Sequence, residues 1–226
     1  MIESMISKAF AETGELADMI IKSLKRNPMP YDAKIEYLQS SGTQFIDTGI
    51  APFPNLKITI TGLFPMQYPS SVFGCRYSGW NSCFGFLSME SDSKIRIDLG
   101  TASSWNPVRW EATSKDLTSV TIDAKNKSAQ LITTDGQTLS HTYSSATMTF
   151  QSEPTIKVFL YDLNNGSSYF GNNMRVSTLQ MWDNDVLFRD FISVRKETTG
   201  YLYDKISNEM FGNDGTGSFI LGQDIF

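Results

Sequence analysis

The stretch FGNDGTGSF, residues 211–219, holds three glycines, one carboxylate, one amide and two hydroxyls near the end of the 226-residue chain. It could be a metal loop, a phosphate cradle or a turn. A P-loop cradle needs a Lys at the end of the loop and a helix behind it, whereas residues 218–221 (SFIL) read as a strand. A calcium loop needs several oxygen ligands, and Asp214 is the only carboxylate of the stretch. We interpret the stretch as a turn between strands, with residues 213–215 and Gly217 as turn positions, and weak calcium binding stays open.

The sequence outward from this turn has the two-residue period of β-strands. From Ile35 onward, short runs alternate apolar and polar residues, and Gly, Asn, Asp, Ser and Pro separate the runs. Asp135-Gly136 is typical of a hairpin turn. About a dozen such strands predict an all-β, antiparallel two-sheet sandwich or jelly roll. The core positions expected from the alternation are Ile58, Ile60, Ile95, Ile97, Leu99, Val120, Ile122 and Ala124.

The composition fits one packed domain of this class and excludes several functions. Hydrophobic residues make up 40% of the chain and charged residues 19%, which argues against disorder. The net charge is −5 and the basic residues are scattered, so neither nucleic acid nor an anionic membrane is an expected partner. No apolar run approaches the roughly 18 residues of a membrane span, and the N-terminus lacks the features of a secretory signal. We therefore expect a soluble protein made in the cytosol.

Residues 1–26 have a different period from the rest of the chain. Apolar side chains recur there at steps of three and four, which predicts an amphipathic α-helix that ends at Asn27-Pro28. Residues 27–34 form a Pro-containing linker, and residues 35–226 form the sandwich domain. The helix must bury its stripe on its own domain, on copies of itself or on a partner, and the stiff spacer favours the last two. We predict an attachment helix with the stripe Ile2, Ile6, Phe10, Leu16, Ile20 and Leu24.

Catalytic patterns are weak. His141 is the only histidine and lies in a strand of Ser and Thr residues, where it would have to serve every role of a triad. Glycan hydrolysis needs two carboxylates about 5–9 Å apart, but Asp98 has Arg96 and Gly100 at the alternate positions of its strand. No catalytic residue, metal-ligand set or cofactor is predicted, and we expect a non-enzymatic protein.

The two cysteines, Cys75 and Cys83, flank the segment RYSGWNS. If residues 73–76 and 83–87 are the arms of a hairpin, the two thiols could face each other and form a bridge. Two cysteines in a chain of this length do not make a disulfide framework, so we favour two separately buried thiols. Without imidazoles they cannot build a zinc site.

Aromatic residues in expected loops suggest a sugar site. Tyr77, Trp80 and Trp105 lie beside amides and hydroxyls, and pyranose rings stack on aromatic faces. The alternative is that each ring closes one end of the sandwich core. Trp182, in the alternating run TLQMWDN, is expected in the core.

Two segments resemble a known family. IEYLQSSGTQFIDTGI (residues 35–50) and VLFRDFISVRKETTGYLYDKISNEMFGNDGTGSFILG (residues 186–222) resemble the opening and closing strands of a concanavalin A-like, LamG-type jelly roll. Residues 183–185 stand for the turn before the second run. Ser193 replaces a usual Pro, and Gln223 stands where a Pro often follows. The resemblance covers both ends of the domain, while the middle agrees in pattern only.

The resemblance implies a non-catalytic domain of phage virion proteins or of bacterial surface proteins. Together with the N-terminal helix it predicts a virion accessory protein, such as a capsid decoration, fibre or tail component, assembled in the host cytoplasm. The helix would bind other virion proteins, and the chain would form a homo-oligomer such as a trimer that displays the sandwich towards glycans or the host surface. The alternative is a bacterial carbohydrate-binding or adhesion module at the cell surface.

Overall fold

The computed structural model of the chain describes residues 29–65, 70–77, 83–89, 94–100, 108–111, 116–143, 150, 152–163 and 168–225. The chain divides into two units, Met1–Asp32 and Ala33–Phe226, and the second contains all the described strands. The predicted attachment helix lies outside the described residues. Within the described ranges, no helix has the length and hydropathy needed to cross a membrane.

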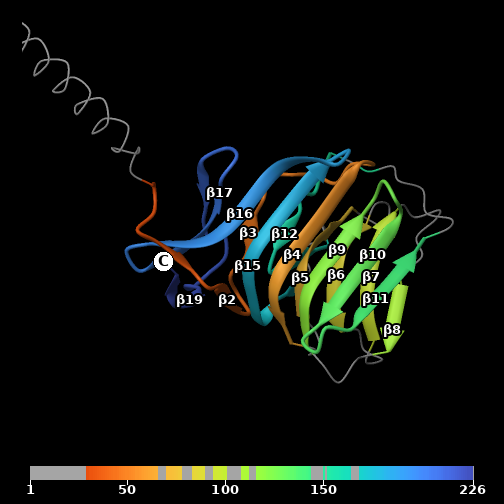
Figure 1. Cartoon of the computed structure of the whole chain (residues 1–226), viewed down its shortest axis with the longest axis horizontal. Coiled ribbons are helices and arrows are strands. Elements are labelled where there is room, and N and C mark those ends of the chain that lie inside the picture. The colour runs from red at the N-terminus through yellow and green to blue at the C-terminus, as the bar shows by residue number, and fades with distance from the viewer. Residues whose placement is uncertain are drawn as a thin grey trace, which may run out of the picture. The chain divides into compact units, whose positions relative to one another are not determined.

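Twelve of the described strands form a large, fully antiparallel sheet (Figure 1). Eight of them follow the order β11-β10-β9-β4-β15-β16-β1-β20, while β2 pairs with β15 and β19, and β17 pairs with β16 and β18. The strands of this sheet are β1 (Ala33–Ile35), β2 (Leu38–Ser41), β4 (Leu56–Phe64), β9 (Leu117–Asp123), β10 (Ser128–Thr133), β11 (Thr138–Thr142), β15 (Asn172–Asp183), β16 (Val186–Lys196), β17 (Thr199–Asp204), β18 (Glu209–Phe211), β19 (Ile220–Leu221) and β20 (Asp224–Ile225).

Eight further described strands form a small sheet with the order β14-β13-β5-β6-β7-β8, in which β12 pairs with β3 and β5. Its pairings are antiparallel except for β13 and β5, which are parallel. The strands are β3 (Ile46–Asp47), β5 (Ser70–Arg76), β6 (Cys83–Met89), β7 (Lys94–Gly100), β8 (Val108–Glu111), β12 (Lys157–Val158), β13 (Leu160–Asp162) and β14 (Ser168–Phe170).

The two sheets share one hydrophobic core, and their arrangement is consistent with a sandwich (Figure 1). The large sheet contributes Ile58 and Ile60 of β4, and the small sheet contributes Ile95 and Ile97 of β7, all fully buried. Burying an aliphatic side chain of this size stabilises the fold by about 1.5–3 kcal/mol. The alternation therefore predicted both the all-β class and the core faces correctly, including Leu99, Val120, Ile122 and Ala124.

The Asp135-Gly136 hairpin is also confirmed. β10 and β11 pair antiparallel in an unbroken register from Ser128↔Thr142 to Ile132↔Thr138. Gly136 has a φ of 83°, and its N–H donates to the carbonyl of Thr133 at 3.0 Å. A positive φ of this kind is favourable for glycine, which explains the dipeptide at the turn.

The expectation that Trp182 lies in the core is wrong. Its neighbour Met181 is buried, whereas Trp182 lies on the opposite face of β15 and is partly exposed, with the Lys57 ammonium 4.9 Å from its ring centroid. The alternation in this run explains the position: Leu179 and Met181 are buried, and Trp182 is on the same face as Thr178 and Gln180.

Candidate functional site

Of the three aromatic residues predicted to form a sugar site, the structure describes one, Tyr77. Tyr77 directly follows β5, and 36% of the residue is exposed. Trp80 and Trp105 lie outside the described residues. Arg76 pairs with Cys83, and Cys83 pairs with Gly100, so β5 and β7 end at the same end of the small sheet. The connections that carry these two tryptophans in sequence therefore leave the sheet at the end where Tyr77 lies.

Beside Tyr77, the face of the small sheet opposite the core carries a buried polar cluster. We call it the outer-face cluster: Arg76, Cys83, Arg96, Asp98 and Tyr161, each at most 8% exposed. The Tyr161 hydroxyl donates to Oδ2 of Asp98 at 2.6 Å, and Nε of Arg96 donates to Oδ1 at 2.7 Å. Asp98 is thus held by a phenol on one oxygen and a guanidinium on the other.

Two glycines make the position of Tyr161 possible. Gly74 and Gly85 are cross-strand partners, and Tyr161 is the partner of Gly74 on its other side. A Cβ on Gly74 would lie 2.6 Å from the Tyr161 ring, and one on Gly85 would lie 2.8 Å from it. Gly74 also has a φ of 150°, which side chains rarely adopt. The ring can therefore lie against the sheet only because both positions lack a side chain.

Burial keeps the cluster's thiol and phenol neutral. It raises the pKa of the Tyr161 phenol well above its usual value, and the nearby Asp98 carboxylate raises it further. Burial, followed by Asp98, raises the pKa of Cys83 to about 12, although Arg76 acts in the opposite direction. At neutral pH both groups are protonated, so Cys83 is a poor nucleophile. What the arrangement can do is hold a fixed set of hydrogen-bonding groups.

The two cysteines are free and buried, as favoured from their number. The arms of the expected hairpin are β5 and β6, but the thiols do not face each other across it. Cys75 pairs with Phe84 and lies in the core cluster, whereas Cys83 pairs with Arg76 on the outer face. A one-residue offset across a pleated pair places side chains on opposite faces, which separates the two thiols.

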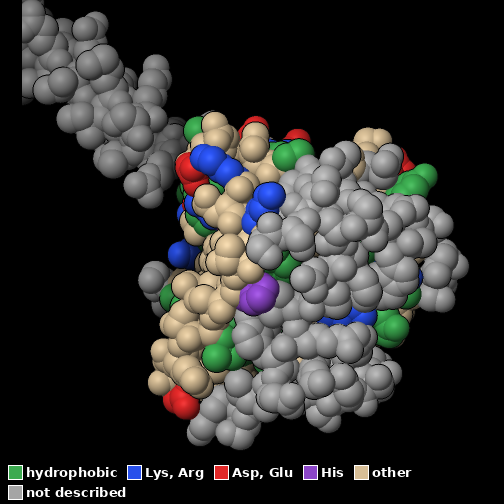
Figure 2. All heavy atoms as spheres, turned by 90° about the vertical axis from the view of Figure 1, so that its right-hand side faces the viewer, with side chains coloured by type: hydrophobic (Ala, Val, Ile, Leu, Met, Phe, Trp, Pro, Cys, Tyr) green, Lys and Arg blue, Asp and Glu red, His purple; other side chains and the backbone are tan. Residues whose placement is uncertain are grey.

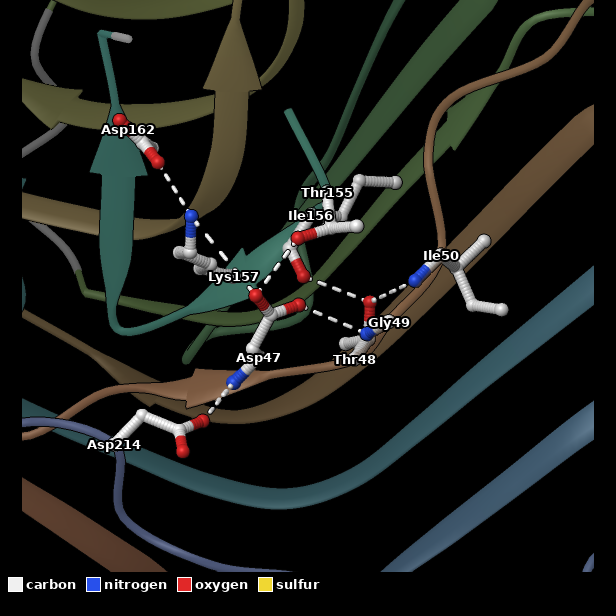
Figure 3. A network of polar contacts seen from close by, with 9 residues as sticks. All are labelled: Asp47, Thr48, Gly49, Ile50, Thr155, Ile156, Lys157, Asp162 and Asp214. Carbon is white, nitrogen blue, oxygen red and sulfur yellow. Dashed lines mark hydrogen bonds and ion pairs between the residues drawn. The ribbon is translucent and has the colours of Figure 1, made fainter. Parts of the chain in front are cut away.

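A second polar network surrounds β3 (Figure 3). Oδ1 of Asp47 accepts the N–H of Gly49 at 2.8 Å, and Oδ2 accepts the Thr155 hydroxyl at 2.8 Å. The Lys157 ammonium forms an ion pair with Asp162 and lies 3.9 Å from Oδ2 of Asp47. The Asp47 carboxylate is therefore occupied by contacts that join the opening segment to residues 155–157.

Thr48 completes this junction (Figure 3). Its hydroxyl donates to the carbonyl of Ile156 at 2.7 Å and accepts the N–H of Ile50 at 3.2 Å. Its own N–H donates to the same Ile156 carbonyl at 3.1 Å. The Asp-Thr-Gly sequence at residues 47–49 is thus explained by a structural joint between β3 and β12.

The glycine stretch at residues 211–219 docks onto the opening segment. The N–H of Asp214 donates to the carbonyl of Phe45 at 2.9 Å, and Oδ1 of Asn213 accepts the Phe45 N–H at 3.2 Å. Oδ2 of Asp214 accepts the N–H of Asp47 at 3.0 Å. The stretch is a connection, as interpreted from the sequence, and its Asp and Asn oxygens accept backbone hydrogen bonds.

The alternation of β7 showed from sequence that Arg96 and Asp98 share a face, but not that they are buried. Tyr161 and the two glycines beneath it were missed. A usable signal was present, because a glycine in the middle of a strand often marks the close approach of another group. Gly74 and Gly85 are in the middle of β5 and β6.

His141 lies in β11, with its ring 5.0 Å from that of Tyr143.

No family model matches this chain, and the comparison with curated proteins finds no relative. Among the described residues, no group of three or more His, Cys, Asp and Glu side chains could hold a metal ion. The candidate site is therefore defined by geometry alone: the outer-face cluster and the exposed Tyr77 beside it.

Proposed function

We propose that this chain is a non-enzymatic structural or accessory protein of a phage virion, with a concanavalin A-like jelly roll as its displayed domain. The observation that carries the proposal is the contact between the two segments behind the family resemblance. The N–H of Gly222 donates to the Tyr37 carbonyl at 2.9 Å, and Ile220 of β19 pairs with Gln39 of β2. Residues 35–50 and 186–222 thus form one continuous substructure, as expected for the first and last strands of such a fold.

The position of β1 supports a display role. The chain enters the sandwich unit at β1, which pairs with β16 and with the edge strand β20. β11, at the other edge of the large sheet, is six strand positions away, or about 29 Å at the usual spacing between strands. An anchor that precedes β1 would be joined to the sandwich at this strand. In this proposal residues 1–26 are that anchor, and they bind a capsid or tail component or bundle copies of the chain.

Removing residues 1–30 is expected to abolish attachment to virions. Full-length chain should be detected by mass spectrometry in purified particles from its source and should rebind to particles that lack it. The shortened chain should fall to background in the same sedimentation assay, because the anchoring stripe is gone. Tyr169→Ala, at a 38% exposed residue of the sandwich, is the control and should bind as full length does. Equal binding by the shortened chain, or particles without the protein, would refute the proposal.

A second candidate function is carbohydrate binding, either on the virion or in a bacterial adhesion module. Tyr77 is exposed and directly follows Arg76 of the outer-face cluster. An exposed aromatic ring is a usual stacking platform of a sugar site. Trp80 and Trp105 belong to connections from the same end of the sheet, so they are the further residues proposed for it.

Glycan binding should depend on these aromatic residues. On a glycan array, Tyr77→Ala, Trp80→Ala and Trp105→Ala are each expected to lower affinity by about tenfold, since an aromatic contact contributes about 0.5–1.5 kcal/mol beyond its buried area. Tyr169→Ala is again the matched control, because it removes an exposed ring from β14 of the same sheet. If the intact chain binds no glycan on the array, the carbohydrate role is excluded while the virion role stands.

A further inference from the structure

The strands at the two ends of each main strand path, β11 and β20 in the large sheet and β14 and β8 in the small sheet, differ in how well they are protected from pairing with another chain. β20 has two residues, and Arg195 holds its Asp224 with two hydrogen bonds of 2.7 and 2.5 Å. β14 has three residues, and β8 (VRWE) carries two charges in its sequence. Short strands and charges are the usual means of preventing edge-to-edge association. β11 has neither.

β11 is a five-residue edge strand without charge, proline or bulge. Its sequence is Thr-Leu-Ser-His-Thr, and its neighbour β10, Ser-Ala-Gln-Leu-Ile-Thr, is also uncharged. Among the described strands, β11 pairs with β10 alone, in a register without a break. Figure 2 views this side of the molecule, and the described surface next to the grey region is mostly tan, the colour of backbone and uncharged polar side chains.

The hydrogen bonds that flank the hairpin show which backbone groups of β11 point outward. Thr133 donates its N–H to the carbonyl of Gln137 at 3.0 Å, and Tyr143 donates its N–H to that of Lys127 at 2.7 Å. Hydrogen-bonded and non-hydrogen-bonded pairs alternate in an antiparallel ladder. Leu139 and His141 therefore bond to β10, and the backbone N–H and C=O groups of Thr138, Ser140 and Thr142 point away from it.

We propose that β11 pairs antiparallel with β11 of a second copy of this chain, about a two-fold axis at Ser140. In this register Ser140 lies opposite its equivalent and Thr138 lies opposite Thr142 of the second copy. All three outward-pointing residues are then matched, which gives six backbone hydrogen bonds across the axis. No other two-fold register pairs all three, because a shift leaves one of them without a counterpart.

The side chains are compatible with this pairing. The exposed face would carry a row of hydroxyls from Thr138, Ser140 and Thr142, and cross-strand Thr and Ser pairs are favourable. On the other face Leu139 would lie opposite His141 of the second copy. In a two-fold strand pair, a charge near the axis lies close to the identical charge of the second copy and repels it. An edge strand without charges avoids this repulsion, and it offers no opposite charge to attract a charged foreign strand.

Cysteine cross-linking of the full-length chain tests the register. In the proposed dimer the two Ser140 Cα atoms are about 5.5 Å apart, within the range of a disulfide. S140C should therefore form a disulfide-linked dimer under mild oxidation. T138C alone should not, because its equivalents would be about 13 Å apart, whereas a mixture of T138C and T142C chains should cross-link to each other. Cys75 and Cys83 are buried, so oxidised wild type is the background control.

A charge at the axis provides the second variant. Adding S140K to both chains of the T138C and T142C mixture should lower the disulfide yield by up to about fivefold, since like charges directly opposite each other destabilise a strand pair. Unchanged circular dichroism would show that the fold is retained. Three results would overturn the proposal. T138C alone could cross-link as efficiently as S140C, or the mixture could give the same yield with and without S140K. The third is that neither S140C nor the mixture cross-links above wild type. Association through the N-terminal helix alone would not produce this dependence of cross-linking on position in β11. The experiment therefore distinguishes helix-mediated association from β11 pairing.

Discussion

Replacing Asp204 with alanine is expected to lower the free energy of unfolding by about 3 kcal/mol, a loss of about 10 °C in Tm for a domain of this size. Asp204 ends β17 and is fully buried. Its Oδ1 accepts the N–H groups of Asp190 at 2.8 Å and Ile206 at 3.1 Å, and its Oδ2 accepts that of Ser207 at 3.2 Å. Alanine would leave these three backbone donors without their acceptor, at about 1 kcal/mol each. Thermal and urea unfolding measure the effect.

The contribution of Asp204 should depend on pH with a definite sign. Burial acts to raise the pKa of its carboxyl, but the hydrogen-bond donors, led by the Asp190 N–H, outweigh burial and hold the pKa below the usual range. A carboxylate of this kind stabilises the fold above the pKa of the unfolded chain, about 3.9, and the stabilisation is lost as the pH falls through the lower folded-state pKa. The difference between wild type and Asp204→Ala should therefore be constant at neutral pH and shrink below about pH 4.

Two matched variants separate the charge of Asp204 from its geometry. Asp204→Asn keeps one oxygen acceptor and should lose less than alanine does. Asp183→Ala removes an exposed acid at the end of β15 and should change stability by no more than about 0.5 kcal/mol. A loss for Asp204→Ala that stays constant down to pH 2, or one no larger than that of Asp183→Ala, would contradict the role given to this carboxylate.

The fold could be predicted from the sequence wherever local information was sufficient. Ile58 and Ile60 alternate with threonines. A period of two on a half-buried strand places the isoleucines on the core face, whichever strands are its neighbours. The same holds for Asp135-Gly136, since an aspartate followed by a glycine with a positive φ forms the hairpin turn without help from the rest of the chain. Trp182 was misplaced because the large apolar ring was weighed above the alternation of its strand, in which Leu179 and Met181 face the core and Trp182 faces away from it.

The site could be predicted only in part, for the same reason. Tyr77 was identified as an exposed aromatic because it borders a segment of turn residues. The hydrogen-bond partner of Asp98 on its other oxygen is Tyr161, which is more than 60 residues away in sequence and lies over Gly74 and Gly85. Arg96 and Asp98 are two residues apart in β7, but the Tyr161 phenol comes from β13, and Arg76 and Cys83 come from β5 and β6, so the complete outer-face cluster had no local signature. The glycines were its only sign.

Replacing Gly215 with alanine is expected to lower the free energy of unfolding by about 3 kcal/mol, or roughly 10 °C in Tm. A Cβ at this position would lie 2.1 Å from the backbone oxygen of Thr43, a distance at which the backbone must move. That oxygen accepts the N–H of Thr216 at 3.1 Å, and the adjacent bond from Asp214 to Phe45 is 2.9 Å. A displaced loop loses both of these bonds and the one between Asn213 and Phe45, at about 1 kcal/mol each.

Gly212→Ala is the control within the same stretch. Its Cβ would meet the Tyr201 ring at 3.3 Å, and a side-chain ring can yield by a few tenths of an ångström. This variant should therefore lose less than about 1 kcal/mol. Hydrogen exchange should locate the effect, with faster exchange of the Phe45, Asp47 and Thr216 amides in Gly215→Ala than in Gly212→Ala. If the two variants unfold at the same temperature, the glycine stretch does not close the sandwich by docking on residues 43–47, and its three glycines need another explanation.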